Sequence, residues 1–250
     1  MLSAVAPSSN RHMAYLLQLE RSIVRPRVAR YAAITMNTPD ETKLRSPLLL
    51  DKNRSILVVI DVQEKLMPHI KSRDVITWNL QRLLTAAELF QIPIRASEQY
   101  PRGLGATVEP LRQHLNNAIG APLTEKSMFS CRECEQWLAE ATCLERPQIV
   151  ITGIETHVCV LQSAFDFMAA GFDVFLVVDA VGSRYRLDHR TALTRISQSG
   201  GNLITTESVL FEWCERSGTP EFKQVSELVK QPRPRRGRKY DESASANRLQ

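Results

Sequence analysis

Short apolar runs rich in Val and Ile alternate with helix-like segments through the middle of the chain. Continuous apolar runs of roughly four to eight residues are typical of strands buried on both faces. The predicted strands are 55–61, 94–97, 123–126, 148–153, 172–179 and 202–205. Between them, apolar residues recur at helical spacing, and the predicted helices are 78–90, 131–142, 156–170, 187–199 and 207–216.

This alternation predicts the fold class. Connections of this length between successive strands are right-handed crossovers, which build a parallel sheet with helices on both of its faces. We therefore expect a doubly wound, mostly parallel sheet in a three-layer α/β/α arrangement, formed by a single domain over about 50–228. Residues 1–49 are then an N-terminal extension and residues 229–250 a basic tail, and both are expected to be flexible.

The positive charge of the chain lies at its ends. The 250 residues carry a net charge of +5 and the pI is about 9.1. Counted by segment, residues 1–35 carry +4, residues 230–250 carry +5 and residues 36–229 carry −4. Nucleic acid is therefore not the expected partner, although the run at 232–239 (PRPRRGRK) could bind phosphate or an anionic surface. A solvated tail is the expected case.

The composition also bears on the compartment. No apolar run approaches the roughly 20 residues needed to cross a bilayer, so we expect a globular, water-soluble protein without a membrane partner. Five cysteines without a disulfide-like spacing favour a reducing compartment, and we expect the cytoplasm. Residues 1–35 contain five Arg and one acidic residue, as an organelle transit peptide would, so organelle targeting is the alternative. Organelle targeting is disfavoured against a second interpretation, in which Met36 is the true start or the residues before it are an unstructured arm.

Three residues with chemical potential follow predicted strands. Asp61 ends the first strand, Lys126 ends the third, and Cys159 lies one turn into the helix after the fourth. Parallel sheets bind ligands at the carboxyl ends of their strands. The pKa of a thiol near a helix N-terminus and a cation is lowered, so we expect Cys159 to be a thiolate nucleophile. Taken singly, each residue has an ordinary explanation: a core Cys, an Asp cap and a surface Lys.

Three motifs around these residues follow one another in order. They are VVIDVQ at 58–63, EKSMFS at 125–130 and GIETHVCV at 153–160, with VVDA at 177–180 after them. This ordered set resembles the isochorismatase-like cysteine hydrolase family over about residues 53–215. The resemblance implies an Asp61, Lys126 and Cys159 catalytic triad. In it, Asp61 moves the proton, Lys126 favours the thiolate and holds Asp61, and Cys159 attacks a carbonyl to give a thioester.

The resemblance also implies the surroundings of the nucleophile. The backbone N–H groups of Glu155 and Cys159 are expected to bind the oxyanion. A cis non-proline peptide bond is expected between Ile154 and Glu155. The Glu155 side chain is expected to narrow or polarise the pocket. Gln63 and Phe129 flank the triad and are candidates to line the pocket, with core packing or capping as an equally good explanation.

Departures from the family's patterns limit the substrate. Nicotinamidase-type members bind a metal through an Asp-x-His pair and a further His after the second strand, but residues 96–105 read ASEQYPRGLG. We therefore expect no metal and no cofactor. Isochorismatase proper lacks the nucleophilic cysteine. The segment at 98–105 resembles instead the isochorismatase domain-containing subgroup of hydrolases, whose substrates are generally undefined.

Two further features have weaker interpretations. Cys131 and Cys134 have redox or half-zinc spacing, but no second Cys or His pair lies near them in the sequence. His157 lies two residues before Cys159, and residues at that spacing do not face each other on a helix. We therefore expect a structural or specificity role for His157 and not a Cys–His pair.

Together these observations predict a metal-independent cysteine hydrolase that cleaves a small-molecule amide or a related acyl C–N bond. Its expected partners are a small-molecule substrate and, since oligomers are common in this architecture, further copies of itself. The alternative is a family member without turnover that acts as a binding or assembly subunit.

Overall fold

The computed structural model describes residues 45–109, 111–119 and 123–234. By its internal contacts the chain divides into two units, Met1–Leu49 and Leu50–Gln250, and all the helices and strands below belong to the second unit. The predictions for residues 1–44 and 235–250, which include the transit peptide and most of the basic run, lie outside the described residues.

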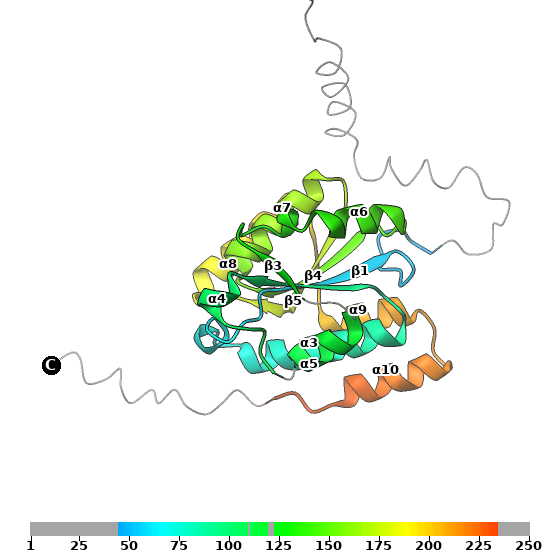
Figure 1. Cartoon of the computed structure of the whole chain (residues 1–250). Coiled ribbons are helices and arrows are strands. Elements are labelled where there is room, and N and C mark those ends of the chain that lie inside the picture. The colour runs from blue at the N-terminus through cyan, green and yellow to red at the C-terminus, as the bar shows by residue number, and fades with distance from the viewer. Residues whose placement is uncertain (1–44, 110, 120–122, 235–250) are drawn as a thin grey trace, which may run out of the picture. The chain divides into compact units, whose positions relative to one another are not determined.

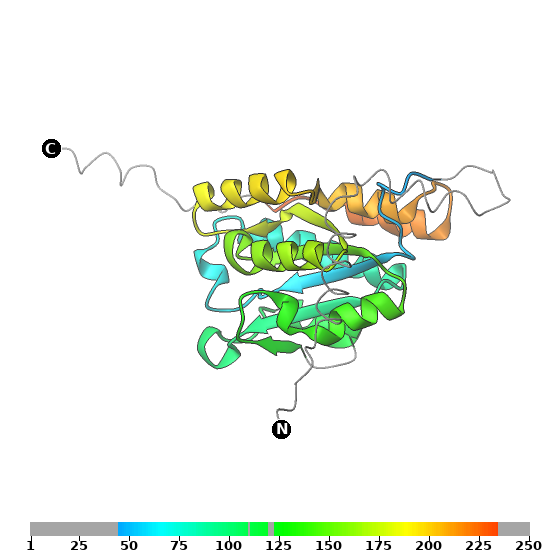
Figure 2. The same ribbon diagram turned by 90° about the horizontal axis from the view of Figure 1, so that it is seen from above.

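Six strands form one sheet in the order β3-β2-β1-β4-β5-β6 (Figures 1 and 2). They are β1 (Ser55–Ile60), β2 (Ile94–Gln99), β3 (Thr124–Lys126), β4 (Gln148–Ile154), β5 (Asp173–Gly182) and β6 (Asn202–Ile204). Every strand pairing in this sheet is parallel, which confirms the predicted α/β class and makes the sheet parallel throughout. The chain winds outward in both directions from β1 and β4. In open parallel sheets, the point where the winding direction reverses is where ligands bind.

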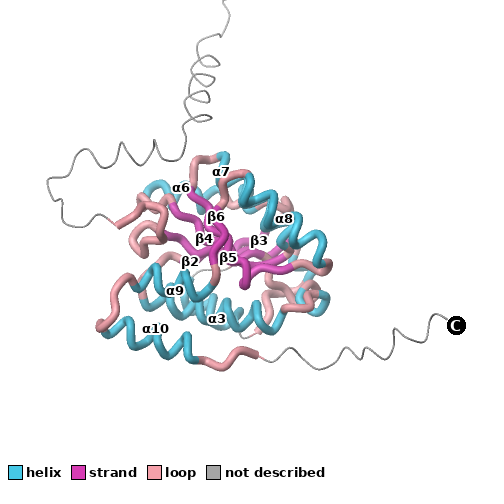
Figure 3. Tube along the Cα trace, turned by 180° about the vertical axis from the view of Figure 1, so that it is seen from behind, coloured by secondary structure: helices cyan, strands magenta, loops and turns pink. Residues whose placement is uncertain are grey.

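Helices cover both faces of the sheet (Figures 1 and 3). One layer contains α3 (Arg73–Leu89), α5 (Leu111–Ile119), α9 (Thr206–Cys214) and α10 (Pro220–Lys230), and the other contains α6 (Glu135–Cys143), α7 (Leu161–Ala169) and α8 (Arg186–Gln198). The alternation along β1 explains the two cores, since Leu57 and Val59 pack into the first layer and Ile56, Val58 and Ile60 into the second. Within the described residues, no helix is both long and apolar enough to cross a bilayer.

Several elements differ from the sequence-based predictions. The helices α4 (Pro101–Leu104), α5 and α10 were not predicted. The predicted helix at 131–142 is split into a short 3-10 turn, η3 (Cys131–Glu133), and α6. The predicted helix at 156–170 begins as a π-helical turn, η4 (Thr156–Val160), and continues as α7. A short 3-10 turn, η2 (Met67–His69), lies between β1 and α3.

Candidate active site

Asp61 and Lys126 form a buried ion pair at the carboxyl end of the sheet. Lys126 Nζ lies 2.7 Å from Asp61 Oδ2, and both side chains are 0% exposed. The hydroxyl of Ser97, at the end of β2, donates to the other oxygen of Asp61 at 2.7 Å. Asp61 itself has a φ of 51°, a left-handed conformation that Asp tolerates better than most residues. The carboxylate is thus held from both sides by two neighbouring strands.

The Lys126 ammonium makes all its hydrogen bonds within the protein. Besides Asp61, it donates to Gln99 Oε1 at 2.6 Å and to the carbonyl oxygens of Phe129 and Met128 at 3.0 and 3.3 Å. Burial alone would lower the pKa of Lys126. The negative charge of Asp61, with smaller contributions from the nearby cysteines, outweighs burial, so the pKa of Lys126 is raised. The ammonium therefore stays charged and fixes the position of the carboxylate.

Cys159 joins this pair from η4, the turn that follows β4, and its residue is 6% exposed. Burial is the largest cause that raises the pKa of the Cys159 thiol. The charge of Asp61 and a hydrogen bond with Asp61 raise it further, whereas Lys126 lowers it. The pKa of Cys159 is thus raised, whereas a helix N-terminus and a nearby cation predicted that it would be lowered. The resting group is therefore a thiol, and the nearby Asp61 carboxylate is the group that can accept its proton.

The backbone before Cys159 brings the ends of β1 and β4 close together. Gly153 has a φ of 107°, and a Cβ atom at this position would lie 2.0 Å from the carbonyl oxygen of Ile60. Only glycine fits such an approach. The next peptide bond, between Ile154 and Glu155, is cis, as the family resemblance implied. The nucleophile turn is therefore built directly against the residue that precedes Asp61.

The Glu155 side chain is buried and forms an ion pair that the sequence did not reveal. Arg184, which follows β5, places its Nε 3.1 Å from Glu155 Oε1, and its backbone N–H donates to Glu155 Oε2 at 3.0 Å. Because β4 and β5 are neighbours, with Ile154 opposite Gly182, the two residues meet at the same sheet edge. Arg184 thus neutralises a carboxylate beside the nucleophile turn.

Gln63 is a fully buried residue that binds backbone groups beside Lys126 and Asp61. Its amide nitrogen donates to the carbonyl oxygens of Gln99 and Gly105 at 3.0 and 2.7 Å. Its amide oxygen accepts from the Gln99 N–H at 2.8 Å. Gln63 therefore holds the residue that accepts from Lys126. Phe129, the other pocket candidate, is 53% exposed at the same edge of the sheet.

The cysteines and histidines near the triad have structural contacts. The buried Cys131 lies 3.5 Å from Ser97 Oγ through its sulfur. His157 Nδ1 and Ser183 Oγ are 3.0 Å apart, and so are Thr156 Oγ1 and His189 Nδ1, which ties η4 to β5 and α8. Over the part of the chain that the structure describes, no group of three or more His, Cys, Asp or Glu side chains could hold a metal ion.

Glu133 organises the loop that accepts from Lys126. Its carboxylate accepts from the backbone N–H groups of Met128 and Ser127, each at 2.7 Å, and from Ser127 Oγ at 2.9 Å. These bonds, with that of Met128 as the largest cause, lower the pKa of Glu133. The sequence did not indicate this role, because only the folded loop brings these donors together.

We expect Glu133→Gln to reduce the loss of stability in acid. A carboxylate with a pKa depressed by folding contributes stability that is present above its unfolded pKa of about 4.3 and is lost as the pH falls through the folded value. Urea unfolding from pH 7 down to pH 3 should therefore show a shallower decline in the free energy of unfolding for the variant. Glu135→Gln, on α6, is the control. Identical pH dependence of wild type and Glu133→Gln would contradict the assignment.

The matches to known proteins cover the part of the chain that contains this site. The family model described as Isochorismatase domain matches residues 55–208. Isochorismatase family protein 1A of Dictyostelium discoideum is 38% identical over 186 residues, which cover 74% of this chain and 90% of that protein. Isochorismatase domain-containing protein 2 of Bos taurus is 37% identical over 186 residues, 73% of this chain and 86% of the relative.

Two solved structures have a similar fold over most of this chain. A structure described as MAR1 ribonuclease from Caenorhabditis elegans has a TM-score of 0.68 and 36% identity, and the match covers 76% of this chain and 96% of that one. YcaC from Escherichia coli, described as an octameric hydrolase of unknown specificity, has a TM-score of 0.65 at 24% identity over 74% of this chain and 92% of that one, and shows the fold alone.

Proposed function

Since the chain belongs to the isochorismatase family of hydrolases, we propose that it is a metal-independent cysteine hydrolase that cleaves the acyl C–N bond of a small amide. The observation that carries the proposal is the buried cluster at the switch point of the sheet. The Cys159 thiol is buried close enough to Asp61 for that carboxylate to raise its pKa, and Lys126 holds the carboxylate in place. A nucleophile, a base and a residue that orients the base are the parts that acyl transfer requires.

The raised pKa of Cys159 determines the order of the first step. Asp61 accepts the thiol proton as the sulfur attacks the carbonyl carbon, so that the thiolate forms only with substrate in place. When the tetrahedral intermediate collapses, the C–N bond breaks and the leaving amine takes that proton from Asp61. Water then attacks the thioester with Asp61 as base, and the acid product and free thiol are released. Lys126 remains charged throughout and compensates the charge of Asp61.

We assign the oxyanion to the backbone N–H groups of Glu155 and Cys159. Glu155 directly precedes the π-helical turn that contains Cys159, so the backbone here follows a path that an ordinary helix start lacks. The pairing of Glu155 with Arg184 supports this assignment, because an unpaired carboxylate beside a developing oxyanion would oppose it.

Asp61→Asn should separate thiol reactivity from turnover. The variant removes the charge and the hydrogen bond that raise the pKa of Cys159, so iodoacetamide should label this thiol faster at pH 7, by about tenfold for each unit by which the pKa falls. Amide turnover should fall by roughly 10²- to 10⁴-fold, because the base is lost. Labelling is followed by mass spectrometry of the Cys159 peptide, with Asp166→Asn as control. Undiminished turnover would show that Asp61 is not the base. Slower labelling would show that the charge of Asp61 does not raise the pKa of this thiol.

The direct test is a search for the acyl-enzyme. Small carboxamides, ureides and hydroxamates are screened for turnover, and the reaction with each substrate found is quenched with acid and digested. We expect the acyl group of the substrate as added mass on the Cys159 peptide. Acylation of another residue, or rapid turnover without any acylated peptide, would exclude the thioester. A protein whose Cys159 reacts no faster than free cysteine and which turns over no amide would instead be a binding or assembly subunit.

The ribonuclease description of the Caenorhabditis elegans relative suggests RNA as a second substrate class. In this chain the Lys126 ammonium is shared among Asp61, Gln99 and loop carbonyl oxygens, so it is not free to bind a phosphate. The site therefore favours an acyl substrate. A short RNA belongs in the same screen, and its Cys159-independent cleavage would argue against acyl transfer as the main activity.

A further inference from the structure

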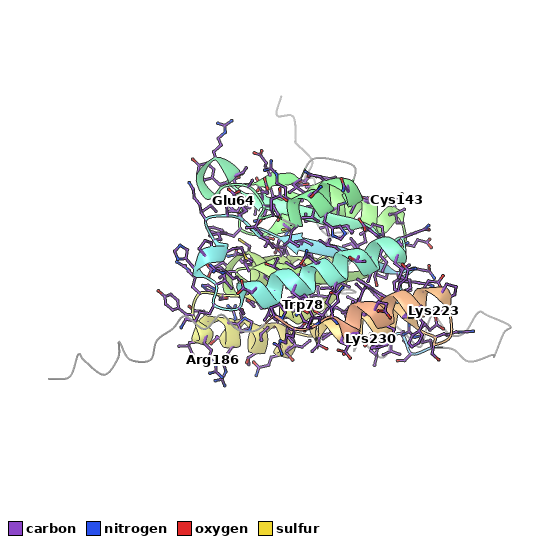
Figure 4. The ribbon with its side chains drawn as sticks, turned by 90° about the horizontal axis from the view of Figure 1, so that it is seen from below. Glu64, Trp78, Cys143, Arg186, Lys223 and Lys230 are labelled. Carbon is purple, nitrogen blue, oxygen red and sulfur yellow. The ribbon has the colours of Figure 1, made fainter. Side chains whose placement is uncertain are left out.

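A groove of about 560 Å³ lies on the α3 layer, apart from the triad. Its walls come from η2, the first turns of α3, the loop before α5 and the segment after α10. The lining residues are Glu64, Met67, Pro68, Arg73, Asp74, Thr77, Trp78, Gln81, Val108, Glu109 and Pro234. Glu64 and Trp78 are labelled in Figure 4. This groove is unrelated to the proposed chemistry, since it contains none of the triad residues.

The groove combines an apolar floor with acidic walls. Met67, Pro68, Trp78 and Val108 supply the apolar surface, and three exposed carboxylates surround it, those of Glu64, Asp74 and Glu109. One cation, Arg73, also lines it and pairs with Asp74 at 3.4 Å. The lining therefore has a net charge of −2, which favours a cationic segment as the occupant.

A cationic segment of this chain begins directly after a residue of the groove wall. The last helix, α10, ends at Lys230, and Pro234 then lies in the groove wall. The next five residues read RRGRK, so residues 235–239 carry four positive charges. Five residues span at most about 17 Å, which keeps all of these charges close to the point where Pro234 contacts the groove.

We propose that residues 235–239 of the chain's own C-terminal segment dock in this groove, with their cations against Glu64, Asp74 and Glu109. The attachment through Pro234 favours this segment over a separate molecule, because a short tether gives an effective concentration on the order of millimolar. The basic tail is then bound by an acidic surface of its own domain, which leaves fewer of its charges available for nucleic acid or an anionic membrane.

Zero-length cross-linking of the full-length protein tests the proposal. A carbodiimide joins a lysine to a carboxylate only when the two are in contact, and Lys239 is the one lysine after Lys230. We expect tryptic peptides that join Lys239 to Glu64, Asp74 or Glu109 within one chain. Their yield should fall severalfold in about 0.5 M NaCl, where the Debye length is roughly 4 Å. A mixture of ¹⁴N- and ¹⁵N-labelled protein separates cross-links within one chain from cross-links between two.

Charge variants complete the test. Asp74→Asn with Glu109→Gln should lower the yield of the remaining Lys239–Glu64 cross-link severalfold. Glu135→Gln with Asp166→Asn, on α6 and α7 of the opposite layer, should leave the yield unchanged. The proposal is overturned if Lys239 reaches none of the three carboxylates, or if the two double variants reduce the yield equally. Cross-links found only between light and heavy chains would overturn it as well, and would show that a second copy occupies the groove.

Discussion

Cys159→Ala is expected to lower turnover of any amide that the protein hydrolyses by about 10⁴-fold or more. Removal of the nucleophile from a hydrolase that forms a covalent intermediate leaves only the rate that binding and oxyanion contacts supply. The fold should change little, because the alanine side chain is only slightly smaller than the cysteine side chain that it replaces. The measurement is kcat/KM for the best substrate of the screen, with the circular dichroism spectrum as a check on folding.

Two other cysteines provide controls for this experiment. Cys143→Ala changes an exposed free thiol, and Cys131→Ala changes a buried thiol close to the triad. The first should leave kcat/KM unchanged, and the second should alter it by much less than Cys159→Ala does. Activity that survives Cys159→Ala would mean that another group attacks the substrate.

The second large effect concerns stability. Lys126→Met leaves Asp61 as a buried carboxylate without its cation, and breaking a buried ion pair in this way costs about 3–5 kcal/mol of the free energy of unfolding. Urea unfolding at pH 7 measures this loss. Lys65→Met is the matched control. Its ammonium is exposed and donates to the Gly103 carbonyl, so a change within about 0.5 kcal/mol is expected.

A double variant identifies the cause of that loss. Asp61→Asn with Lys126→Met removes both charges, so no uncompensated ion remains in the core. We expect this double variant to be more stable than Lys126→Met alone, since the interaction energy between two residues in contact is not additive. Equal or lower stability would show that the Lys126 hydrogen bonds to Gln99 and Phe129, and not its charge, stabilise the site.

The strands β1, β4 and β5 were predictable because each is a long, mostly apolar run and both faces of this sheet are covered, whereas β2, β3 and β6 are shorter or more polar. The missed helices α5 and α10 do carry a helical spacing of apolar residues. The residues packed against the core are Leu111, Leu115 and Ala118 in α5, and Phe222, Val225, Leu228 and Val229 in α10. Each helix is short and mostly polar, but the spacing of its apolar residues was a signal that the sequence-based prediction did not use.

The meeting of Asp61, Lys126 and Cys159 was predictable because each lies at or just after the carboxyl end of a strand, and these ends share one edge of a parallel sheet. Their surroundings were not. Ser97, Gln99 and Glu133 act through hydrogen bonds to partners that the sequence does not pair with them. The direction of the Cys159 pKa was predicted wrongly, because a helix dipole was weighed without the burial of the thiol and the nearby charge of Asp61.

The position of Lys126 on a short strand determines how its ion pair with Asp61 can break while the domain stays folded. Its strand, β3, is one of the two edge strands of the sheet and consists of three residues paired only with β2, whereas Asp61 and Cys159 follow the two central strands. Edge segments with few pairings open at free energies well below that of global unfolding. Fraying of this single strand would separate the cation from the carboxylate while the core stays folded. The lifetime of the assembled Asp61, Lys126 and Cys159 cluster is therefore set by a short edge strand and not by the stability of the domain.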